Sequence, residues 1–228
     1  MPYIGDYLMV FGLNVKPEHG YYVEVAALDG DLKLVEIADK TPDGGLPLNR
    51  NYLWSAGRAV DPTHMPTRME WRDRKKNPIP DVDNGLVLNV SDRAKALIEQ
   101  FEPEIHQFLA VEYFDTHGRR LERRWFFIAN RRIDSLDHRM TTMILEDGVC
   151  WTPASDVLRR APDQIPSGFD VNAPSKMVFN RAQIGDAHIW CDKHLLNGGP
   201  FISDAFAKAR KSTGMTGLRL SENGVETV

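Results

Sequence analysis

The stretch Ala182-Gln-Ile-Gly-Asp-Ala-His-Ile-Trp-Cys-Asp-Lys-His194, followed closely by Gly198-Gly-Pro-Phe-Ile-Ser-Asp204, carries the most specific local signals in the chain. The apolar run just before it predicts a short strand at 177–179. A turn is expected at 184–186, where glycine supplies a backbone angle that most residues avoid. Aromatic and β-branched residues predict a second strand at 188–191.

The second half of this region predicts a loop, a capped helix and a closing strand. Two adjacent glycines and a proline favour a loop at 197–200. Ser203 is expected to cap a helix that carries Asp204 at its positive N-terminal end and stops at Gly214. A strand over 216–220 then completes a strand, turn, strand, loop, helix, strand unit.

Upstream, one more helix and one hairpin are clearly marked. Ser91 is expected to begin a helix, because apolar residues recur after it at helical spacing and Pro103 lies just beyond its end. Strands are predicted at 106–114 and 123–129, with a turn at 115–118 between them.

The N-terminal third has a different composition. Aromatic and β-branched runs predict an antiparallel meander, with strands at 7–13, 21–28 and 32–37. Residues 38–85 contain six prolines and are expected to be irregular, with short extended pieces at 52–54 and 68–71. Strands separated by turns, with few helices, predict an α+β protein of mainly antiparallel strands and a few short capped helices. We expect a β-rich module over residues 1–85 and an α+β module over residues 86–228, or one continuous globule.

The composition is that of an ordinary globular protein, with 228 residues, 42% hydrophobic residues, 26% charged residues and a net charge of −4. The mild acidity argues against a domain dominated by phosphate contacts. Cys150 and Cys191 are the only cysteines and show no metal-binding spacing, which favours reduced thiols. Neither a secretory signal nor an apolar run long enough to span a bilayer is visible, so we expect a cytoplasmic protein without membrane contact.

The residues of the opening region also match a known pattern. The pattern consists of Phe179, Ile184-Gly185, His188-Ile189-Trp190, Asp192, Leu195, Gly198-Gly199, Phe201-Ile202-Ser203-Asp204 and Thr216-Gly217-Leu218. It resembles the C-terminal signature of a bacterial family that was first catalogued as a domain of unknown function. That family was later assigned, as number eleven in its series, to the immunity proteins of polymorphic toxin systems. The resemblance covers roughly residues 85–220 and implies a non-enzymatic protein, without a cofactor, that neutralises a partner toxin encoded next to it.

Within this resemblance, we expect the signature residues to determine the fold, since turns and caps recur whatever toxin is bound. These residues are Gly185, His188, Trp190, Asp192, Gly198, Gly199, Ser203 and Asp204. The toxin-binding surface is expected in the irregular segments, where aromatic residues can anchor a partner and acidic residues can steer a basic one. The candidates are Trp54, Trp71, Asp81 and Asp83, and, as a second choice, Asp134 and Asp137 in the 134–147 loop.

A metal-assisted hydrolase is an alternative reading, because His188, Cys191 and His194 are all potential zinc ligands. Residues three apart on a strand point to opposite faces, however. We therefore expect His188 and Trp190 on one face of the strand, and Ile189 and Cys191 on the other.

Two further chemistries can be considered. Ser203 or Ser91 could form a triad with His188 and Asp192, but no Gly-x-Ser-x-Gly elbow is present to expose a serine. Scattered carboxylates, Asp134, Asp137, Glu146 and Asp147, are more typical of a solvated surface than of acid–base catalysis.

A nucleic-acid-binding module is the third alternative. Six arginines between residues 119 and 132 surround the aromatic run Trp125-Phe-Phe127, as in a groove for single strands. The competing interpretation is a hairpin with a charged tip and a buried aromatic face, which the acidic net charge favours.

Overall fold

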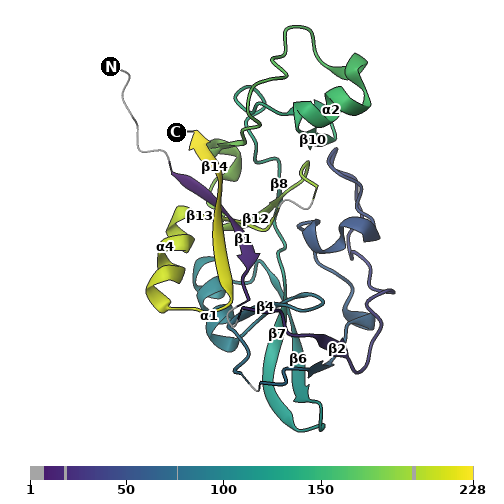
Figure 1. Ribbon diagram of the computed structural model, residues 1–228, viewed down its shortest axis with the longest axis vertical. Coiled ribbons are helices and arrows are strands. Elements are labelled where there is room, and N and C mark those ends of the chain that lie inside the picture. The colour runs from purple at the N-terminus through teal and green to yellow at the C-terminus, as the bar shows by residue number, and fades with distance from the viewer. Residues whose placement is uncertain (1–7, 18–19, 76, 197–198, 228) are drawn as a thin grey trace.

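The computed structural model describes residues 8–17, 20–75, 77–196 and 199–227, and has an α+β architecture of strands with short helices (Figure 1). This confirms the expected fold class. Within these residues, the strands form two six-stranded sheets and one two-stranded sheet. No helix of the described residues is both long and apolar enough to cross a membrane.

The first sheet brings the two ends of the described chain together. Its strand order is β11-β14-β1-β13-β12-β8, and β1 pairs antiparallel with both of its neighbours. Figure 1 shows β1 and β14 crossing side by side. The bounds are β1 (Met9–Val15), β8 (Arg132–Ile133), β11 (Val178–Asn180), β12 (Ile189–Asp192), β13 (Phe201–Ser203) and β14 (Leu218–Thr227). The predicted meander is therefore wrong, since the first strand pairs with the C-terminal region rather than with the next strand.

The second sheet contains the predicted hairpin. Its order is β2-β3-β6-β7-β5-β4, with β6 and β7 paired over most of their length. The bounds are β2 (Val25–Ala27), β3 (Arg68–Trp71), β4 (Val82–Asn84), β5 (Leu88–Val90), β6 (Gln107–Asp115) and β7 (Arg120–Ile128). The extended piece expected at 68–71 is confirmed as β3, which pairs in parallel with β6.

Two predicted extended segments fold differently. The strand expected at 32–37 is wrong: Asp31 caps a turn there, accepting hydrogen bonds from the amides of Lys33 and Leu34 at 2.9 Å each. Only an isolated bridge from Ile37 to Val60 remains. The segment at 52–54 lies in the 3₁₀ helix η1 (Arg50–Ser55), begun by the side chain of Asn49, and a second such helix, η2 (Pro62–His64), follows.

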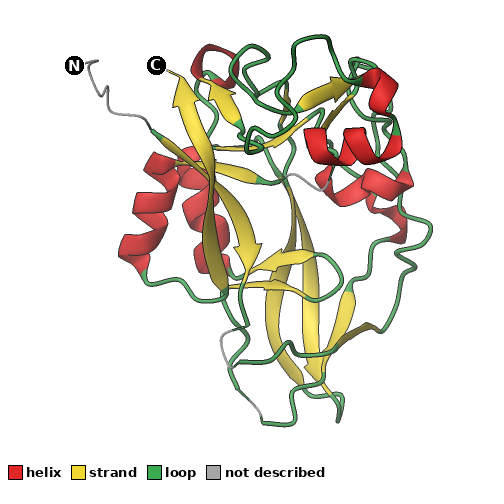
Figure 2. Cartoon of the chain, turned by 45° about the horizontal axis from the view of Figure 1, so that its top comes forward, coloured by secondary structure: helices red, strands yellow, loops and turns green. Residues whose placement is uncertain are grey.

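The two longest helices are the two predicted from their serine caps. Ser91 accepts a hydrogen bond from Ala94 at the start of α1 (Asp92–Phe101), and Ser203 accepts one from Phe206 at the start of α4 (Asp204–Thr213). Figure 2 shows these helices side by side on one flank of the molecule. The ring centroids of Phe101 and Phe206 lie 5.3 Å apart. Both caps therefore fix where the helices begin, as the sequence predicted.

The remaining elements are small and lie mostly at one end of the molecule (Figure 1). They are α3 (Arg181–Ile184), the hairpin of β9 (Ile144–Glu146) with β10 (Cys150–Thr152), α2 (Ala154–Arg160) and the 3₁₀ helix η3 (Pro162–Gln164). Between the two large sheets, one core cluster collects buried residues of both sheets and of α1 and α4, including Val90, Ile98, Phe127, Ile202 and Phe206. The division of the chain at residues 85 and 86 stays a prediction.

Candidate functional site

Strand β12 separates two hydrophobic clusters. Ile189 and Cys191 pack into the cluster under α1 and α4, whereas Trp190 packs on the other side, against Phe179 and Phe201. The faces predicted for these three residues of β12 are confirmed. All three are fully buried inside the fold.

His188 does not share the face of Trp190. It precedes β12, and its ring meets the edge of Phe101 at 4.8 Å, on the side of α1. The prediction of a shared face is wrong because the alternation of a strand begins only at Ile189. His188 Nδ1 lies 2.8 Å from the Oγ of Ser203, so the ring supports the start of α4.

The serine triad is not assembled. Ser203 contacts His188, but its Oγ also accepts the amide hydrogen of Phe206 at 3.2 Å. The carboxylate of Asp192 instead accepts hydrogen bonds from Ser135 and from the backbone amide of His194. Ser91 uses its hydroxyl for α1 and for Asp81.

A buried carboxylate, Glu102, joins α1 to the segment before β12. Its Oε1 accepts the amide hydrogen of His188 at 2.8 Å and lies 3.1 Å from Arg131 Nε, and its Oε2 contacts His106 Nε2. Burial opposes ionisation, but the contacts with His106 and with the amide of His188 outweigh it and hold the pKa of Glu102 below its ordinary value. The carboxylate is thus an internal anion that three neighbours compensate.

The three ligands of the proposed hydrolase do not converge. Among the described residues, the one group of three His, Cys, Asp or Glu side chains with ligand atoms within 4.8 Å of one another is Asp134, His138 and His194. Cys191 is fully buried, and burial raises the pKa of its thiol to about 12. Neither His188 nor Cys191 belongs to the group that contains His194.

The arginine-rich hairpin is largely neutralised. Arg119 pairs with Asp115, Arg120 with Glu112, and Arg131 with Glu102 and Asp186. Arg124 is fully buried and donates to Asn89, Glu122 and the carbonyl of Pro80. The guanidinium carbon of Arg123 lies 4.3 Å from the ring centroid of Trp125. Most of these guanidinium groups are paired with carboxylates or buried in the core. The hairpin therefore does not present the open basic groove that a single-stranded nucleic acid requires.

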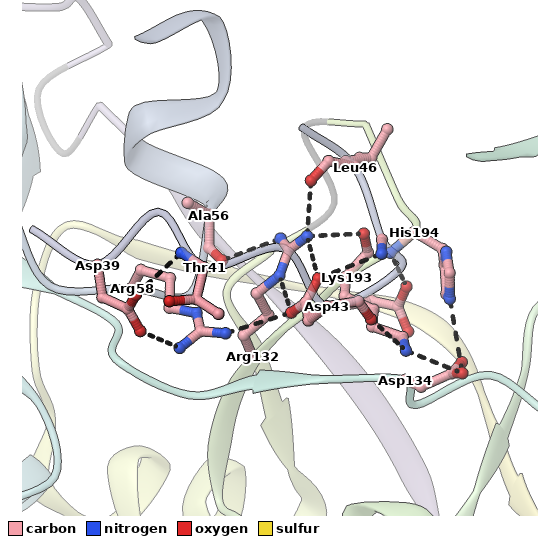
Figure 3. Close-up of polar contacts among 12 residues, drawn as sticks. Asp39, Thr41, Asp43, Leu46, Ala56, Arg58, Arg132, Asp134, Lys193 and His194 are labelled. Carbon is pink, nitrogen blue, oxygen red and sulfur yellow. Dashed lines mark hydrogen bonds and ion pairs between the residues drawn. The ribbon is translucent and has the colours of Figure 1, made fainter. Parts of the chain in front are cut away.

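Arg132 ties the proline-rich segment to the first sheet, as Figure 3 shows. Its buried guanidinium donates to Asp43 at 2.7 Å and to the carbonyls of Ala56 and Leu46 at 3.1 and 2.8 Å. Burial works against the Asp43 anion, but the hydrogen bonds from Arg132 and Gly45 lower the pKa of Asp43 to about 2. A specific ion pair between Asp43 and Arg132 therefore holds the irregular segment against the first sheet.

A groove of about 390 Å³ opens beside η1. Trp54 is 37% exposed at this groove, and Leu86, 44% exposed, lies at it too. Leu13 and Pro200 also line it, so segments from distant parts of the chain form its walls. An indole and an aliphatic side chain that are both partly exposed make this groove the strongest candidate for contact with a partner.

The other predicted partner-binding residues lie in different surroundings. Trp71 is buried in the core, where its ring centroid lies 6.3 Å from that of Tyr113, and Asp83 is buried as well. Asp81 is half-buried and holds Arg93, Ser91 and Thr216 together. Of the four residues proposed within 38–85, Trp54 is the one that presents an apolar surface to solvent.

Asp134 and Asp137 flank a turn at the end of β8. Asp137 accepts the amide hydrogens of Arg139 and Met140 at 2.9 and 3.0 Å, and Asp134 faces His138 and His194. The spacing of Asp134 and His138 is visible in the sequence, but their proximity to His194 depends on the pairing of β8 with β12. Sequence reasoning missed His138 and Leu86 because no local pattern marks either residue.

The signature glycines have separate roles. Gly185 ends α3 with a φ of 63°, which favours glycine. Gly199 has a φ of 134°, and a Cβ there would lie 3.4 Å from Cys191. Gly198 lies outside the described residues.

Known proteins provide one further finding. The family described as the immunity protein family (Imm11) matches residues 18–225 of the chain. The match therefore covers nearly the whole described structure, including the N-terminal third, where the sequence showed no motif. No curated protein matches the chain.

Proposed function

Because the chain belongs to the Imm11 immunity protein family, we propose that it binds a partner toxin of a polymorphic toxin system and neutralises it. The family match over residues 18–225 is the observation that carries this proposal. The protein acts by occupying a surface of the toxin and not by catalysis. Neutralisation takes place in the compartment where the toxin acts, which we propose is the cytoplasm. It protects the cell that carries the gene.

The proposed contact surface is the groove beside η1. Interfaces concentrate their binding energy in a few aromatic or arginine anchors surrounded by less important contacts. Trp54 and Leu86 are both partly exposed at this groove, and its volume of about 390 Å³ can accept a large side chain of the toxin. Asp134 and Asp137 form a second proposed contact region, whose charges would attract a basic toxin.

The proposal makes a quantitative distinction between a binding protein and an enzyme. An inhibitor that occludes the toxin must be present in at least equimolar amount, whereas an enzyme that inactivates the toxin works at a small fraction of it. The test uses the toxin domain encoded beside this gene, purified separately and titrated with the protein in an assay of toxin activity. Inhibition should be complete near a one-to-one ratio and should coincide with a stable complex in size-exclusion chromatography.

Two results would overturn the proposal. One is full inactivation of the toxin by a hundredth of an equivalent, which would indicate catalysis. The other is the absence of both complex formation and protection when the two proteins are produced together in growing cells. A toxin domain from an unrelated system serves as the control and should be neither bound nor inhibited.

A further inference from the structure

We propose that Asp134, His138 and His194 form a binding site for a divalent transition-metal ion, with zinc as the ion that best fits the ligand set. One carboxylate and two imidazoles are ligands that zinc accepts in proteins, and three protein ligands leave a fourth position open. The ligand atoms of these residues lie within 4.8 Å of one another. The site goes beyond the proposed binding of a toxin, although it shares Asp134 with the second proposed contact region.

The parallel pairing of β8 with β12 creates the cluster. Cys191 is opposite Arg132 and Asp192 is opposite Ile133, so the next residues of both strands, Lys193 and Asp134, leave the sheet together. His194 follows directly. The chain brings His138 back beside Asp134, because Asp137 accepts hydrogen bonds from two backbone amides and so fixes the intervening turn.

Two pairs of ligand atoms lie near the spacing that a metal site requires. Asp134 Oδ1 lies 3.0 Å from His138 Nε2, and Asp134 Oδ2 lies 3.5 Å from His194 Nε2. In a tetrahedral zinc site with bonds of about 2.0–2.1 Å, adjacent ligand atoms are about 3.3 Å apart. The two contacts use different oxygens of Asp134, so rotation of that carboxylate would have to bring one oxygen and the two Nε2 atoms around an ion.

The orientation of His194 is the strongest single observation. Its Nδ1 lies 2.9 Å from the carbonyl oxygen of Val149, which can only accept a hydrogen bond, so Nδ1 carries the proton. Its Nε2 is thereby directed at the Asp134 carboxylate, 3.5 Å from Oδ2 (Figure 3). The side chain of His194 is only 4% exposed, so the ring is held in this orientation inside the protein. The bond to Val149 is the outer contact that orients histidine ligands of metals.

The surroundings allow an ion to enter and be held. The side chain of His138 is 44% exposed, which leaves a route from solvent. Lys193 competes for the carboxylate, since its Nζ lies 3.6 Å from Asp134 Oδ2, but the same Nζ also lies 3.3 Å from the carbonyl oxygen of Asp43. The ammonium group thus keeps an acceptor when a metal ion takes Asp134.

Zinc titration of the untagged, chelator-treated protein tests the site. Isothermal titration calorimetry at neutral pH should show one equivalent of Zn²⁺ bound with micromolar or tighter affinity. His138→Ala and Asp134→Asn should each weaken binding by at least about tenfold. His117→Ala removes an exposed histidine of the β6–β7 turn and is the matched control, expected to leave affinity unchanged.

A second readout separates a metal site from a simple ion pair. Long-range ¹H–¹⁵N spectra of the histidine rings should show the Nε2 signals of His138 and His194 shifting when Zn²⁺ is added, while Nδ1 of His194 keeps its proton. The proposal fails if no zinc binds or if these Nε2 signals do not respond to it. It also fails if zinc binds with the same affinity to the wild type, to His138→Ala and to Asp134→Asn.

Discussion

Ser135 and Asp192 lie far apart in the sequence and meet through two hydrogen bonds, from the amide and the hydroxyl of Ser135 to Asp192 Oδ2, each 2.7 Å long. Asp192 Oδ1 accepts a third, from the amide of His194 at 2.7 Å. One buried carboxylate thus orders the exits of two neighbouring strands, β8 and β12. These contacts support the expectation that Asp192 helps to determine the fold.

We predict that Asp192→Ala lowers the free energy of unfolding by about 3 kcal/mol, because it leaves buried backbone amides without an acceptor. Asp192→Asn retains one carbonyl oxygen and should cost less. Urea unfolding followed by tryptophan fluorescence measures both. Asp186→Ala, which removes an almost fully exposed carboxylate, is the control, and an equal loss there would contradict the assignment.

The Asp43–Arg132 pair should contribute to stability well beyond a surface ion pair. The lowering of the pKa of Asp43 from 3.8 to about 2 corresponds to stabilisation on the order of 2 kcal/mol at neutral pH. A double-mutant cycle with Asp43→Asn and Arg132→Met should give a coupling energy of that order. The exposed pair Arg159–Asp156 on α2 provides the comparison and should couple by less than about 0.5 kcal/mol. Equal coupling in the two pairs would refute the prediction.

Glu102 should make the protein sensitive to acid. Its folded pKa lies below its ordinary value of 4.5, so its stabilising contribution is complete above that value and is lost as the pH falls through the lowered folded pKa. Unfolding free energies measured from neutral pH down to about pH 3 should fall more steeply in the wild type than in Glu102→Gln. Parallel curves for the two proteins would show that another group governs the acid transition.

Two glycines with left-handed backbone angles should respond differently to alanine. Gly217 has a φ of 83°, and a Cβ there would meet the carbonyl oxygen of Val82 at 1.9 Å, whereas nothing lies within 4 Å of a Cβ at Gly185. Gly185 has a ψ of −120°, so Gly185→Ala should cost the backbone strain of a sparsely populated region, about 1–3 kcal/mol. Gly217→Ala should cost clearly more, because the backbone around Val82 must also move. Thermal unfolding compares them, and a similar loss at both sites would disprove the role of the close approach.

Trp54 and Leu86 should contribute to toxin binding without supporting the fold. Trp54→Ala is expected to raise the Kd for the toxin by about 30-fold, the effect of losing about 2 kcal/mol at an anchor residue. Leu86→Ala should act in the same direction. Surface plasmon resonance measures affinity, and circular dichroism confirms folding. Leu121→Ala is the matched control, since Leu121 is equally exposed on the β6–β7 hairpin but lies outside the groove.

If both groove variants bind as tightly as the wild type, the groove is not the contact surface. Charge reversal at Asp137 then tests the second proposed region. Trp71 is unsuitable for such a test, because removing its buried ring would cost about 3–5 kcal/mol of stability and confuse binding with folding.

The locally encoded parts of the fold could be predicted from the sequence. Ser91 and Ser203 cap their helices through hydrogen bonds to residues three positions later, so the signal and the structure lie in one short segment. The β6–β7 hairpin is predictable for the same reason. The 32–37 segment was not, because its buried residues, Val35 and Ile37, fit a core position without joining a strand ladder.

The candidate sites depend on contacts that no local pattern reveals. Trp54 and Trp71 look alike in the sequence, yet one lies at a groove and the other in the core. The proximity of His194 to Asp134 follows from a two-residue parallel ladder between segments that are far apart in the chain. Sequence reasoning could propose each residue as a candidate but could not bring the members of a site together.

The position of β1 between β13 and β14 has a consequence during biosynthesis. The ribosome releases β1 before the rest of the described chain, but both of its partners emerge only after nearly all of the described chain has been made. Until then, the nascent chain must keep an apolar strand without its neighbours, and non-local pairing of this kind is slow. A prematurely terminated product that lacks β14 would leave both β1 and β11 exposed to proteases. We therefore expect fragments that lack β14 to give no protection against the proposed toxin, rather than weaker protection.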